Sequence, residues 1–348
     1  MVDTTVLKKK YKDTFYEWGT YPEMEFMSTW FPNLDYVTGW GIPIGRVVEL
    51  FGKNGSGKTT LAMQIAERYT DKWDKVLFVD TERTFPNRLS NDLIDVHEPD
   101  CWEDTVDRIV EGIEGWYKLI ILDSVAATVP MVELDTSADQ MNIGKQARLM
   151  NRMMRMVPSK LRTHWVTLLL INQFRTNIGG YWNPNQTTGG TGIAYACSLR
   201  MEIATSPKKD WILNSDGELE LKPSKIKVIK TKMKWWNDEW VLYLWADGRY
   251  SELMDTLISC LQYEIITKKW AFIKYGEDTL WQGMIKVALY LKDAPEIVAV
   301  LKEQLQERLK IKVAWSWMLF SDQDTKEVYN KLVGTYNKKW KTTLQLIK

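Results

Sequence analysis

The sequence predicts an α/β fold built on a mostly parallel, twisted sheet flanked by helices, and three observations predict it. Residues 52–60 read G-x-x-x-x-G-K-T-T, the pattern of a phosphate-binding loop. An apolar, β-branched run precedes this loop and a helical pattern follows it. Further apolar runs that each end in a polar residue occur at 76–80, 118–124 and 166–172. Such runs, separated by helical stretches, are typical of parallel strands covered on both faces.

Composition indicates a soluble globular protein of two or three domains. The chain has 348 residues, of which 45% are hydrophobic and 26% charged, and its net charge is +1. Since the whole chain is not basic, any contact with nucleic acid must come from local placement of charge. Three distant cysteines and two histidines show no metal-ligand spacing, which argues against zinc and favours a reducing cytoplasm. No apolar run is long enough to span a membrane.

The phosphate loop predicts nucleotide binding. Its glycines let backbone N–H groups wrap phosphates, and the start of the following helix adds a favourable dipole. Lys58 is expected to reach the β- and γ-phosphates of ATP, and Thr59 to bind Mg²⁺. The expected nucleotide contacts are Gly52, Lys53, Asn54, Gly55, Ser56, Gly57, Lys58, Thr59 and Thr60. An incidental glycine-rich turn is the weaker interpretation, because a strand and a helix flank the loop as the mechanism requires.

Polar residues at the ends of the predicted strands suggest a hydrolytic site. Asp123 closes a hydrophobic strand and suits the acidic element that holds Mg²⁺ through water. Glu82 could orient and activate the attacking water, and Gln173 could sense the γ-phosphate. Taken singly, each is more often a strand-end cap or a solvated group. Together behind a phosphate loop they favour function, because the carboxyl ends of parallel strands form the ligand-binding edge.

Two stretches suggest contacts with nucleic acid. Within 141–157, Arg148, Arg152 and Arg155 share one helix face opposite apolar residues, and a solvated basic face explains this as well as a DNA-backbone surface does. Residues 174–192 form a long loop rich in Gly, Asn and Thr after a strand tip, and such loops are usually functional or disordered. Its arginine and aromatic residues fit a nucleic-acid loop.

The remaining segments predict the domain organisation. Three segments alternate apolar with polar residues, as edge strands in partly antiparallel pairing do: 198–203, 224–232 and 241–245. From about Ser251 the pattern becomes largely helical, which predicts a small α/β or mostly helical second domain. The expected parts are an N-terminal arm (1–30), a core (31–250) and a C-terminal domain with a basic tail (251–348). The arm could dock on a neighbouring subunit or be a solvated terminus.

Several blocks together resemble the RecA family of DNA strand-exchange recombinases, in its bacterial and phage branch. They lie in the family's order at 41–49, 78–82, 122–127, 147–150, 171–175, 183–184, 187–190 and 227–232. The Asn-Gln-Phe-Arg block at 172–175 with Thr-Thr-Gly-Gly at 187–190 is the specific part, whereas the phosphate loop alone would indicate only an NTPase. The resemblance covers about residues 31–305.

The resemblance implies a RecA-type ATPase core that forms a helical filament on single-stranded DNA, with ATP between adjacent subunits. It implies that the neighbouring subunit supplies two cations to the γ-phosphate, and that Gln173 couples the phosphate to the DNA loop that begins one residue later. The implied catalytic residues are Glu82, Lys58, Gln173, Lys230 and Lys232. Mg²⁺ would be held at Thr59 and Asp123.

Two DNA-binding loops are implied, over 132–144 and 174–190. The implied contacts are Met141, Arg148, Asn151, Arg155, Arg175, Thr176, Asn177, Ile178, Thr188, Gly189 and Gly190. Glycines suit backbone N–H contacts to phosphate, and Ile178 suits wedging between bases. The chain departs from the family in two extra residues before Gly144 and in the lack of an acidic tail over 322–348, which favours a phage recombinase over a bacterial housekeeping one.

The predicted function is DNA-stimulated ATP hydrolysis coupled to strand exchange between a coated single strand and a homologous duplex. The expected partners are single- and double-stranded DNA, further copies of the chain, and single-strand-binding and loader proteins, in the cytoplasm of a bacterium or a phage-infected host. A ring-forming ATPase or helicase is one alternative, and the 172–175 block argues against it. A non-catalytic accessory that uses ATP as a switch is another, and Lys58 and Glu82 argue against that.

Overall fold

The computed structural model describes residues 9, 23–85, 91–127, 129–131, 145–176, 185–213, 217–233 and 239–318. The chain divides into two compact units, each described by itself. The first consists of Met1–Ser28, Trp40–Ile203 and Val228–Asn237. The second consists of Thr29–Gly39, Ala204–Lys227 and Asp238–Lys348. The predicted domain boundaries at residues 30 and 250 remain predictions.

A parallel sheet forms the centre of the first unit. Its strands are β3 (Val47–Gly52), β4 (Lys75–Asp80), β5 (Ile94–His97), β6 (Tyr117–Asp123), β7 (Thr167–Thr176) and β9 (Leu199–Thr205). Neighbouring strands follow the order β9-β3-β7-β6-β4-β5, and each of these pairs is parallel. Every residue of β3 is buried, as expected for a strand with helices on both sides. The predicted α/β class with a mostly parallel sheet is confirmed.

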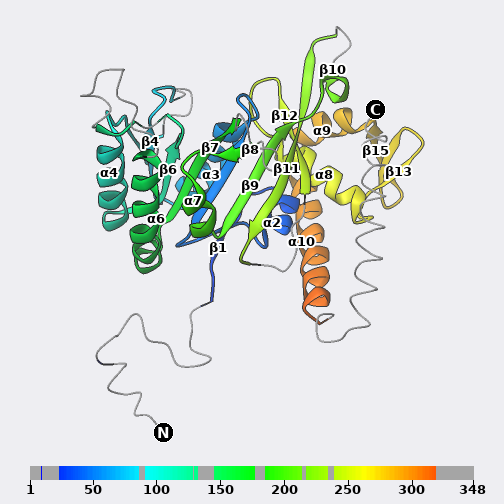
Figure 1. Cartoon of the computed structure of the whole chain (residues 1–348). Helices are drawn as coiled ribbons and strands as arrows, with labels where there is room; N and C mark the ends of the chain where they lie inside the picture. Colours follow the sequence, from blue (N-terminus) through cyan, green and yellow to red (C-terminus); the bar gives the residue numbers. More distant parts are fainter. Residues whose placement is uncertain are drawn as a thin grey trace. The chain divides into compact units, whose positions relative to one another are not determined.

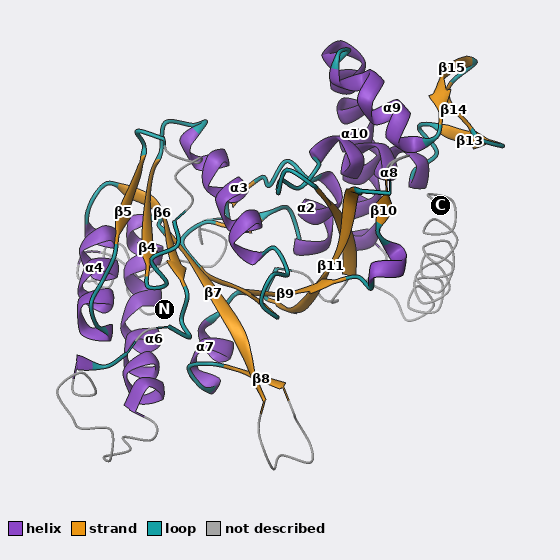
Figure 2. Cartoon of the chain, turned by 90° about the horizontal axis from the view of Figure 1, so that it is seen from above, coloured by secondary structure: helices purple, strands orange, loops and turns teal. Residues whose placement is uncertain are grey.

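Helices cover both faces of this sheet. The helix α3 (Lys58–Thr70) lies on one face, and α4 (Trp102–Glu114) and α6 (Lys145–His164) lie on the other (Figures 1 and 2). The buried apolar residues of α4 and α6 form one cluster with strand residues that include Leu77, Ile120 and Leu170. The short helix α7 (Thr191–Ala196) packs on α6, and β1 (Phe26–Met27) pairs antiparallel with β2 (Ile42–Pro43).

One predicted edge strand lies inside the sheet. The strand β9 has β3 on one side and β11 (Leu219–Thr231) on the other, so the prediction of an edge at 198–203 is wrong. The polar residues that alternate along β9 do not need a solvent-facing side, because Arg200 forms an ion pair with the buried Glu49 of β3. Alternation along the sequence therefore reflected an internal ion pair and not an exposed face.

The second unit combines an antiparallel sheet with helices. The strand β11 begins in this unit and ends in the first, and here it pairs antiparallel with β10 (Ile212–Leu213) and β12 (Glu239–Trp245). The helices of the unit are α2 (Pro32–Thr38), η2 (Lys208–Asp210), α8 (Glu252–Gln262), α9 (Met284–Lys292) and α10 (Pro295–Met318). In the part of the chain that the structure describes, no helix combines the length and apolar character needed to cross a bilayer.

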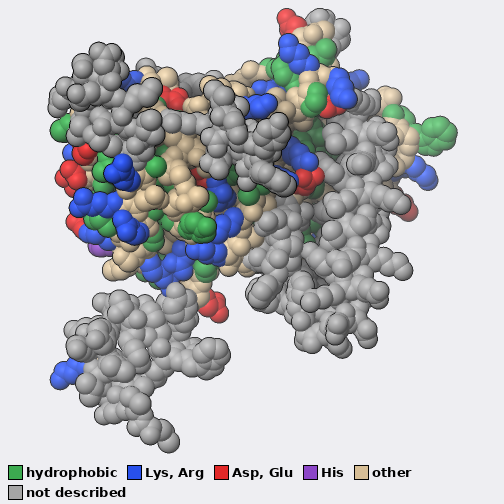
Figure 3. All heavy atoms as spheres, viewed as in Figure 1, with side chains coloured by type: hydrophobic (Ala, Val, Ile, Leu, Met, Phe, Trp, Pro, Cys, Tyr) green, Lys and Arg blue, Asp and Glu red, His purple; other side chains and the backbone are tan. Residues whose placement is uncertain are grey.

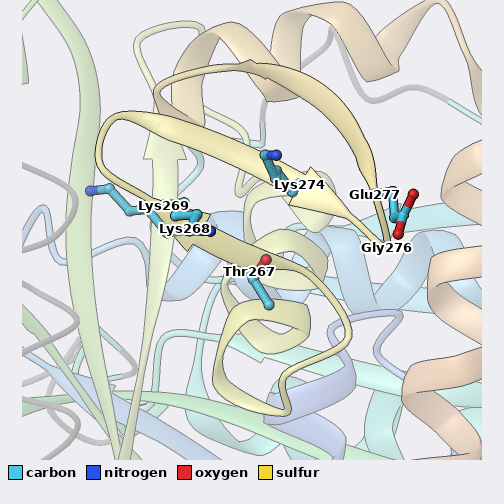
Figure 4. A pocket seen from close by; sticks show the side chains of 6 residues that line it. All are labelled: Thr267, Lys268, Lys269, Lys274, Gly276 and Glu277. Carbon is cyan, nitrogen blue, oxygen red and sulfur yellow. The ribbon is translucent and has the colours of Figure 1, made fainter.

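A small antiparallel sheet lies within the second unit. Its strands are β13 (Thr267–Lys269), β14 (Phe272–Tyr275) and β15 (Asp278–Gln282). An open hollow of about 580 Å³ lies beside it and is lined by Lys268, Lys269 and Lys274 together with Thr267, Gly276 and Glu277 (Figure 4). None of the residues predicted to bind a nucleotide lines this hollow.

Candidate functional site

The phosphate loop joins β3 to α3 at the carboxyl edge of the parallel sheet. Gly57 caps the start of α3 with φ +93°, a left-handed conformation that glycine adopts without steric cost. At the other end of the loop, a Cβ on Gly52 would lie 2.2 Å from the carbonyl oxygen of Ile203. The backbones of β3 and β9 therefore touch where the loop begins, and a side chain at this position would push them apart.

Lys58 lies folded across its own loop. Its Nζ donates to the carbonyl oxygens of Gly52 at 3.3 Å and Lys53 at 2.9 Å, and the side chain is only 6% exposed. Burial lowers the pKa of Lys58, while the carboxylates of Asp123 and Glu82 oppose that shift. Because the ammonium group is already held at the loop, it is positioned to exchange carbonyl oxygens for phosphate oxygens.

Thr59 and Asp123 form the candidate metal site. The Thr59 hydroxyl donates to Asp123 Oδ2 at 2.6 Å. Burial raises the pKa of Asp123 to about 6, the Thr59 hydrogen bond opposes this shift, and the carboxylates of Glu82 and Asp80 add to it. A hydroxyl and a carboxylate are hard oxygen ligands of the kind that Mg²⁺ prefers. The two residues therefore fit an Mg²⁺ ion beside phosphates at the start of α3.

Glu82 lies within a cluster of side chains from three neighbouring strands of the sheet. Ser124 Oγ donates to Glu82 Oε1 at 2.5 Å, and Gln173 Nε2 donates to the same oxygen at 3.1 Å. Glu82 and Ser124 follow β4 and β6, whereas Gln173 lies within β7, and these three strands are neighbours in the sheet. The structure thus brings together Glu82, Asp123 and Gln173, which the sequence placed at separate strand ends.

Two members of the site were not predicted from the sequence. Ser124 binds Glu82, and Asp80 holds the turn on which Glu82 lies. The buried Asp80 carboxylate accepts N–H groups from Glu82 at 3.1 Å, Thr84 at 2.7 Å and Phe85 at 2.7 Å. An aspartate at the end of a strand, two residues before a candidate catalytic group, is the signal that could have identified this turn.

Arg83, the residue after Glu82, faces away from the cluster. Its guanidinium donates to Asp100 at 2.7 Å and lies 3.9 Å from Glu98. Its backbone has φ +56°, an uncommon conformation for a residue with a side chain. The turn therefore directs two consecutive charged side chains to different partners.

The two lysines at the end of β11 lie in the same unit as the phosphate loop. Lys230 Nζ donates to the carbonyl oxygens of Ala194 at 2.6 Å and Tyr195 at 3.0 Å, at the end of α7. Burial lowers the pKa of Lys230, and the nearby positive charge of Lys232 lowers it further. Lys232 is exposed. In this chain Lys230 therefore caps a helix end.

The second predicted DNA loop starts as a hairpin. The strand β7 continues past Asn172 to Thr176 and pairs antiparallel with β8 (Asn185–Thr187). The predicted strand end at Asn172 is wrong: β7 continues to Thr176, and the returning strand pairs with its last three residues. Arg175 and Thr176 lie on this hairpin. Three predicted DNA contacts lie outside the described residues: Met141, Asn177 and Ile178.

The helix α6 has the amphipathic character that the sequence predicted. Arg148, Arg152 and Arg155 are exposed, whereas Met150 and Met153 are buried in the core. Figure 3 shows Lys and Arg side chains gathered on the face of the first unit that carries this helix. The helix also runs through Pro158 to His164, beyond the predicted amphipathic stretch at 141–157.

Neighbouring predicted contacts differ in exposure. Asn151 is half-buried against α7, where a Cβ on Gly192 would overlap its side-chain oxygen. Thr188 and Gly189 are buried and Gly190 is exposed. Of these four predicted contacts, Gly190 is therefore the one that lies open to a ligand without rearrangement.

The site consists of a phosphate loop, Asp123 at a strand end, and Glu82 bound by Ser124 and Gln173. This arrangement defines a nucleotide-binding protein of the P-loop class. The RecA N-terminal domain model matches residues 11–239. The Protein RecA of Synechocystis sp. is 32% identical over 308 residues, which cover 84% of each chain. Those of Phytoplasma mali and Geobacter metallireducens are 30% and 31% identical over 83% and 82% of this chain, and 87% and 86% of their own. The chain belongs to the RecA family.

Proposed function

We propose that this chain is an ATP-dependent DNA recombinase that forms a helical filament on single-stranded DNA, pairs it with a homologous duplex and exchanges strands. One observation carries the proposal. Gln173, whose amide donates to Glu82, lies on β7, and β7 runs on directly into the hairpin of the second DNA loop. Gln173, which donates to Glu82, and the predicted DNA contacts Arg175 and Thr176 are thus parts of one strand. Membership of the RecA family implies recombination and repair with binding of DNA and a nucleotide.

The geometry supports ATP hydrolysis at the carboxyl edge of the sheet. Lys58 would bind the β- and γ-phosphates in place of the loop carbonyls. Thr59 and Asp123 would hold Mg²⁺, which when bound neutralises phosphate charge. Ser124 and Gln173 both donate to Oε1 of Glu82, so Oε2 of this carboxylate is left to accept a proton from a water molecule and to orient it.

Filament assembly would depend on ATP through the lysines of β11. To reach the γ-phosphate held by an adjacent subunit, Lys230 would leave the carbonyl oxygens of Ala194 and Tyr195, and Lys232 would reach it from its exposed position. Two cations supplied by a neighbour make assembly and nucleotide state mutually dependent, because each then stabilises the other. Residues 1–30 would serve as an arm in the same assembly.

The DNA surface would consist of α6 and the two loops. Arg148 and Arg155 present exposed cations to the phosphate backbone, and Gly190 can offer a backbone N–H group. Binding through such contacts should weaken steeply with salt, because counterions are released from the DNA. We place this activity in the cytoplasm of a bacterium or a phage-infected host, with single-strand-binding and loader proteins as further partners.

The test is strand exchange between a circular single strand and a homologous linear duplex, with and without ATP. We expect exchange with ATP and none without it, and Lys58→Ala should abolish ATP-dependent filament assembly. Arg175→Ala should keep ATP binding but remove DNA stimulation of hydrolysis. Equal loss of nucleotide binding in both variants would contradict this division of roles. Closed rings in place of filaments under electron microscopy, with no exchange, would contradict the proposal itself.

A further inference from the structure

A buried carboxylate lies beneath the phosphate loop and takes no part in the proposed chemistry. Glu49 is in the middle of β3, three residues before Gly52, and its side chain is fully buried. Its Oε2 accepts from Nε of Arg200, which lies directly opposite on β9 and is 14% exposed. Its Oε1 accepts from Nδ2 of Asn172 at 2.8 Å. A buried ion pair is weak evidence for stability. The role of Glu49 is therefore inferred from the other hydrogen bonds that Arg200 and Asn172 make.

Both donors have a second bond, and both of these bonds lead to the end of the second DNA loop. Asn172 Nδ2 also donates to the carbonyl oxygen of Thr188 at 2.8 Å. The terminal NH2 group of Arg200 donates to Thr187 Oγ1 at 3.2 Å. The Glu49 carboxylate thus binds two side chains, and these two side chains donate hydrogen bonds to Thr187 and Thr188, which precede Gly189 and Gly190.

The same network reaches Gln173. Asn172 Oδ1 accepts the backbone N–H of Gln173 at 2.8 Å, and the N–H of Thr188 lies 3.3 Å from the Gln173 carbonyl oxygen. The main chain of Gln173 is therefore held between Asn172 and the end of the loop. Its side-chain amide is the group that donates to Glu82. A shift of Thr188 cannot occur without breaking these bonds or moving Gln173.

Two aromatic rings pack beside the network. The guanidinium of Arg200 lies 4.9 Å from the ring centre of Phe51, which is buried. Phe51 in turn packs edge-on against Phe174 at 5.4 Å, the residue that starts the hairpin. Hydrogen bonds in such a low-dielectric setting are strong when satisfied and costly when broken, so the network favours defined arrangements over gradual drift.

We propose that Asn172 and Arg200 are positioning residues that transmit DNA occupancy of the loop to Gln173 and thereby to Glu82. DNA bound at Thr188, Gly189 or Gly190 changes the position of the loop end, the two side chains follow, and Gln173 moves relative to the hydrolytic carboxylate. This inference rests on the proposed function, because it explains how DNA would stimulate hydrolysis. It assigns the coupling to Asn172 and Arg200, two side chains that are not among the predicted contacts to ATP or DNA.

The test is Arg200→Lys in the full chain, with ATP hydrolysis measured with and without saturating single-stranded DNA. Lysine keeps a positive charge for Glu49 but lacks the rigid fork that reaches Thr187 at the same time. We expect at least about a fivefold loss of DNA stimulation, with unchanged DNA-independent hydrolysis and nucleotide affinity. Thr187→Val should cause the same loss, and Thr187→Ser should restore stimulation. Arg46→Lys, the same substitution just before β3, is the matched control and should keep full stimulation.

The double variant Arg200→Lys with Thr187→Val separates coupling from independent damage. If both residues act through one hydrogen bond, the double variant loses no more stimulation than either single variant. Losses that multiply, or full stimulation in Arg200→Lys, would overturn the inference, as would an equal loss of DNA-independent hydrolysis. A wild-type protein without DNA stimulation would overturn the proposed function and this inference together, whereas the other outcomes leave the proposed function intact.

Discussion

Replacing Asp123 with asparagine should stabilise the ligand-free protein while removing its capacity to bind Mg²⁺. Asparagine has the shape of the carboxyl group and can still accept the hydroxyl bond of Thr59. Asparagine carries no charge, so it avoids the free-energy cost of burying a carboxylate, the cost that raises the pKa of Asp123 to about 6. The variant therefore removes an electrostatic penalty that the wild-type fold carries at neutral pH.

The magnitude follows from the difference between the folded and unfolded pKa of this carboxyl group. The pKa rises from 3.8 in the unfolded chain to about 6 in the fold, so the stability from this group is fully present below pH 3.8 and is lost as pH rises through about 6. Relative to wild type, Asp123→Asn should raise the free energy of unfolding by about 3 kcal/mol at pH 8 and by about 1.5 kcal/mol at pH 5.

The assay is urea unfolding of both proteins between pH 5 and pH 8, without nucleotide and with a metal chelator present. Asp107→Asn, which removes an exposed carboxylate from α4, is the control and should change the free energy of unfolding by less than about 0.5 kcal/mol. Adding Mg²⁺ and ATP should stabilise wild type more than Asp123→Asn, since the variant lacks the carboxylate proposed to hold Mg²⁺. A variant no more stable than wild type at pH 8, or a difference that does not shrink toward pH 5, would refute the reasoning.

Three further predictions concern the phosphate loop, the residues around Glu82 and the lysine at the end of β11. Gly52→Ala should lower the free energy of unfolding by about 2 kcal/mol or more in urea unfolding, because its Cβ would lie 2.2 Å from the Ile203 carbonyl; a change below about 0.5 kcal/mol would contradict that contact. Ser124→Ala should lower kcat about tenfold with little change in nucleotide affinity, since it removes the hydroxyl that binds Glu82, and an unchanged kcat in steady-state kinetics would exclude that role. Lys230→Ala should bind nucleotide with wild-type affinity by calorimetry but fail to assemble with ATP by light scattering, and normal assembly would argue against a lysine supplied by a neighbour.

The sequence predicted those parts of the site whose position depends only on residues nearby in the chain. A phosphate loop requires a strand before it and a helix after it, and a buried parallel strand ends in polar residues at one edge, so Lys58, Thr59 and Asp123 could be placed without a structure. The position of Glu82 relative to Gln173 depends on the order of strands, in which β4, β6 and β7 are neighbours. The likeness to a family indicated that these residues belong together, and the structure shows the contacts.

The parts that the sequence did not predict depend on partners distant in the chain. The strand β7 is longer than its apolar run because β8 returns to pair with it. The alternation along β9 reflects an ion pair to Glu49, 151 residues away, and not an exposed edge. Lys230 caps α7 through two carbonyl groups that no pattern in the sequence identifies. Each case is a long-range hydrogen bond or ion pair, and local propensity carries no information about such contacts.

The pKa shifts of Lys58 and Asp123 indicate which charges a ligand of this site should carry. Burial lowers the pKa of Lys58 and raises the pKa of Asp123, so for each group the loss of water outweighs the attraction between the two opposite charges. A ligand that reverses both shifts must place negative charge beside Lys58 and positive charge beside Asp123. Phosphates with a bound divalent cation do so, and no single ion of either sign can. The two opposite shifts are therefore consistent with the proposed binding of phosphate groups together with a divalent cation at this site.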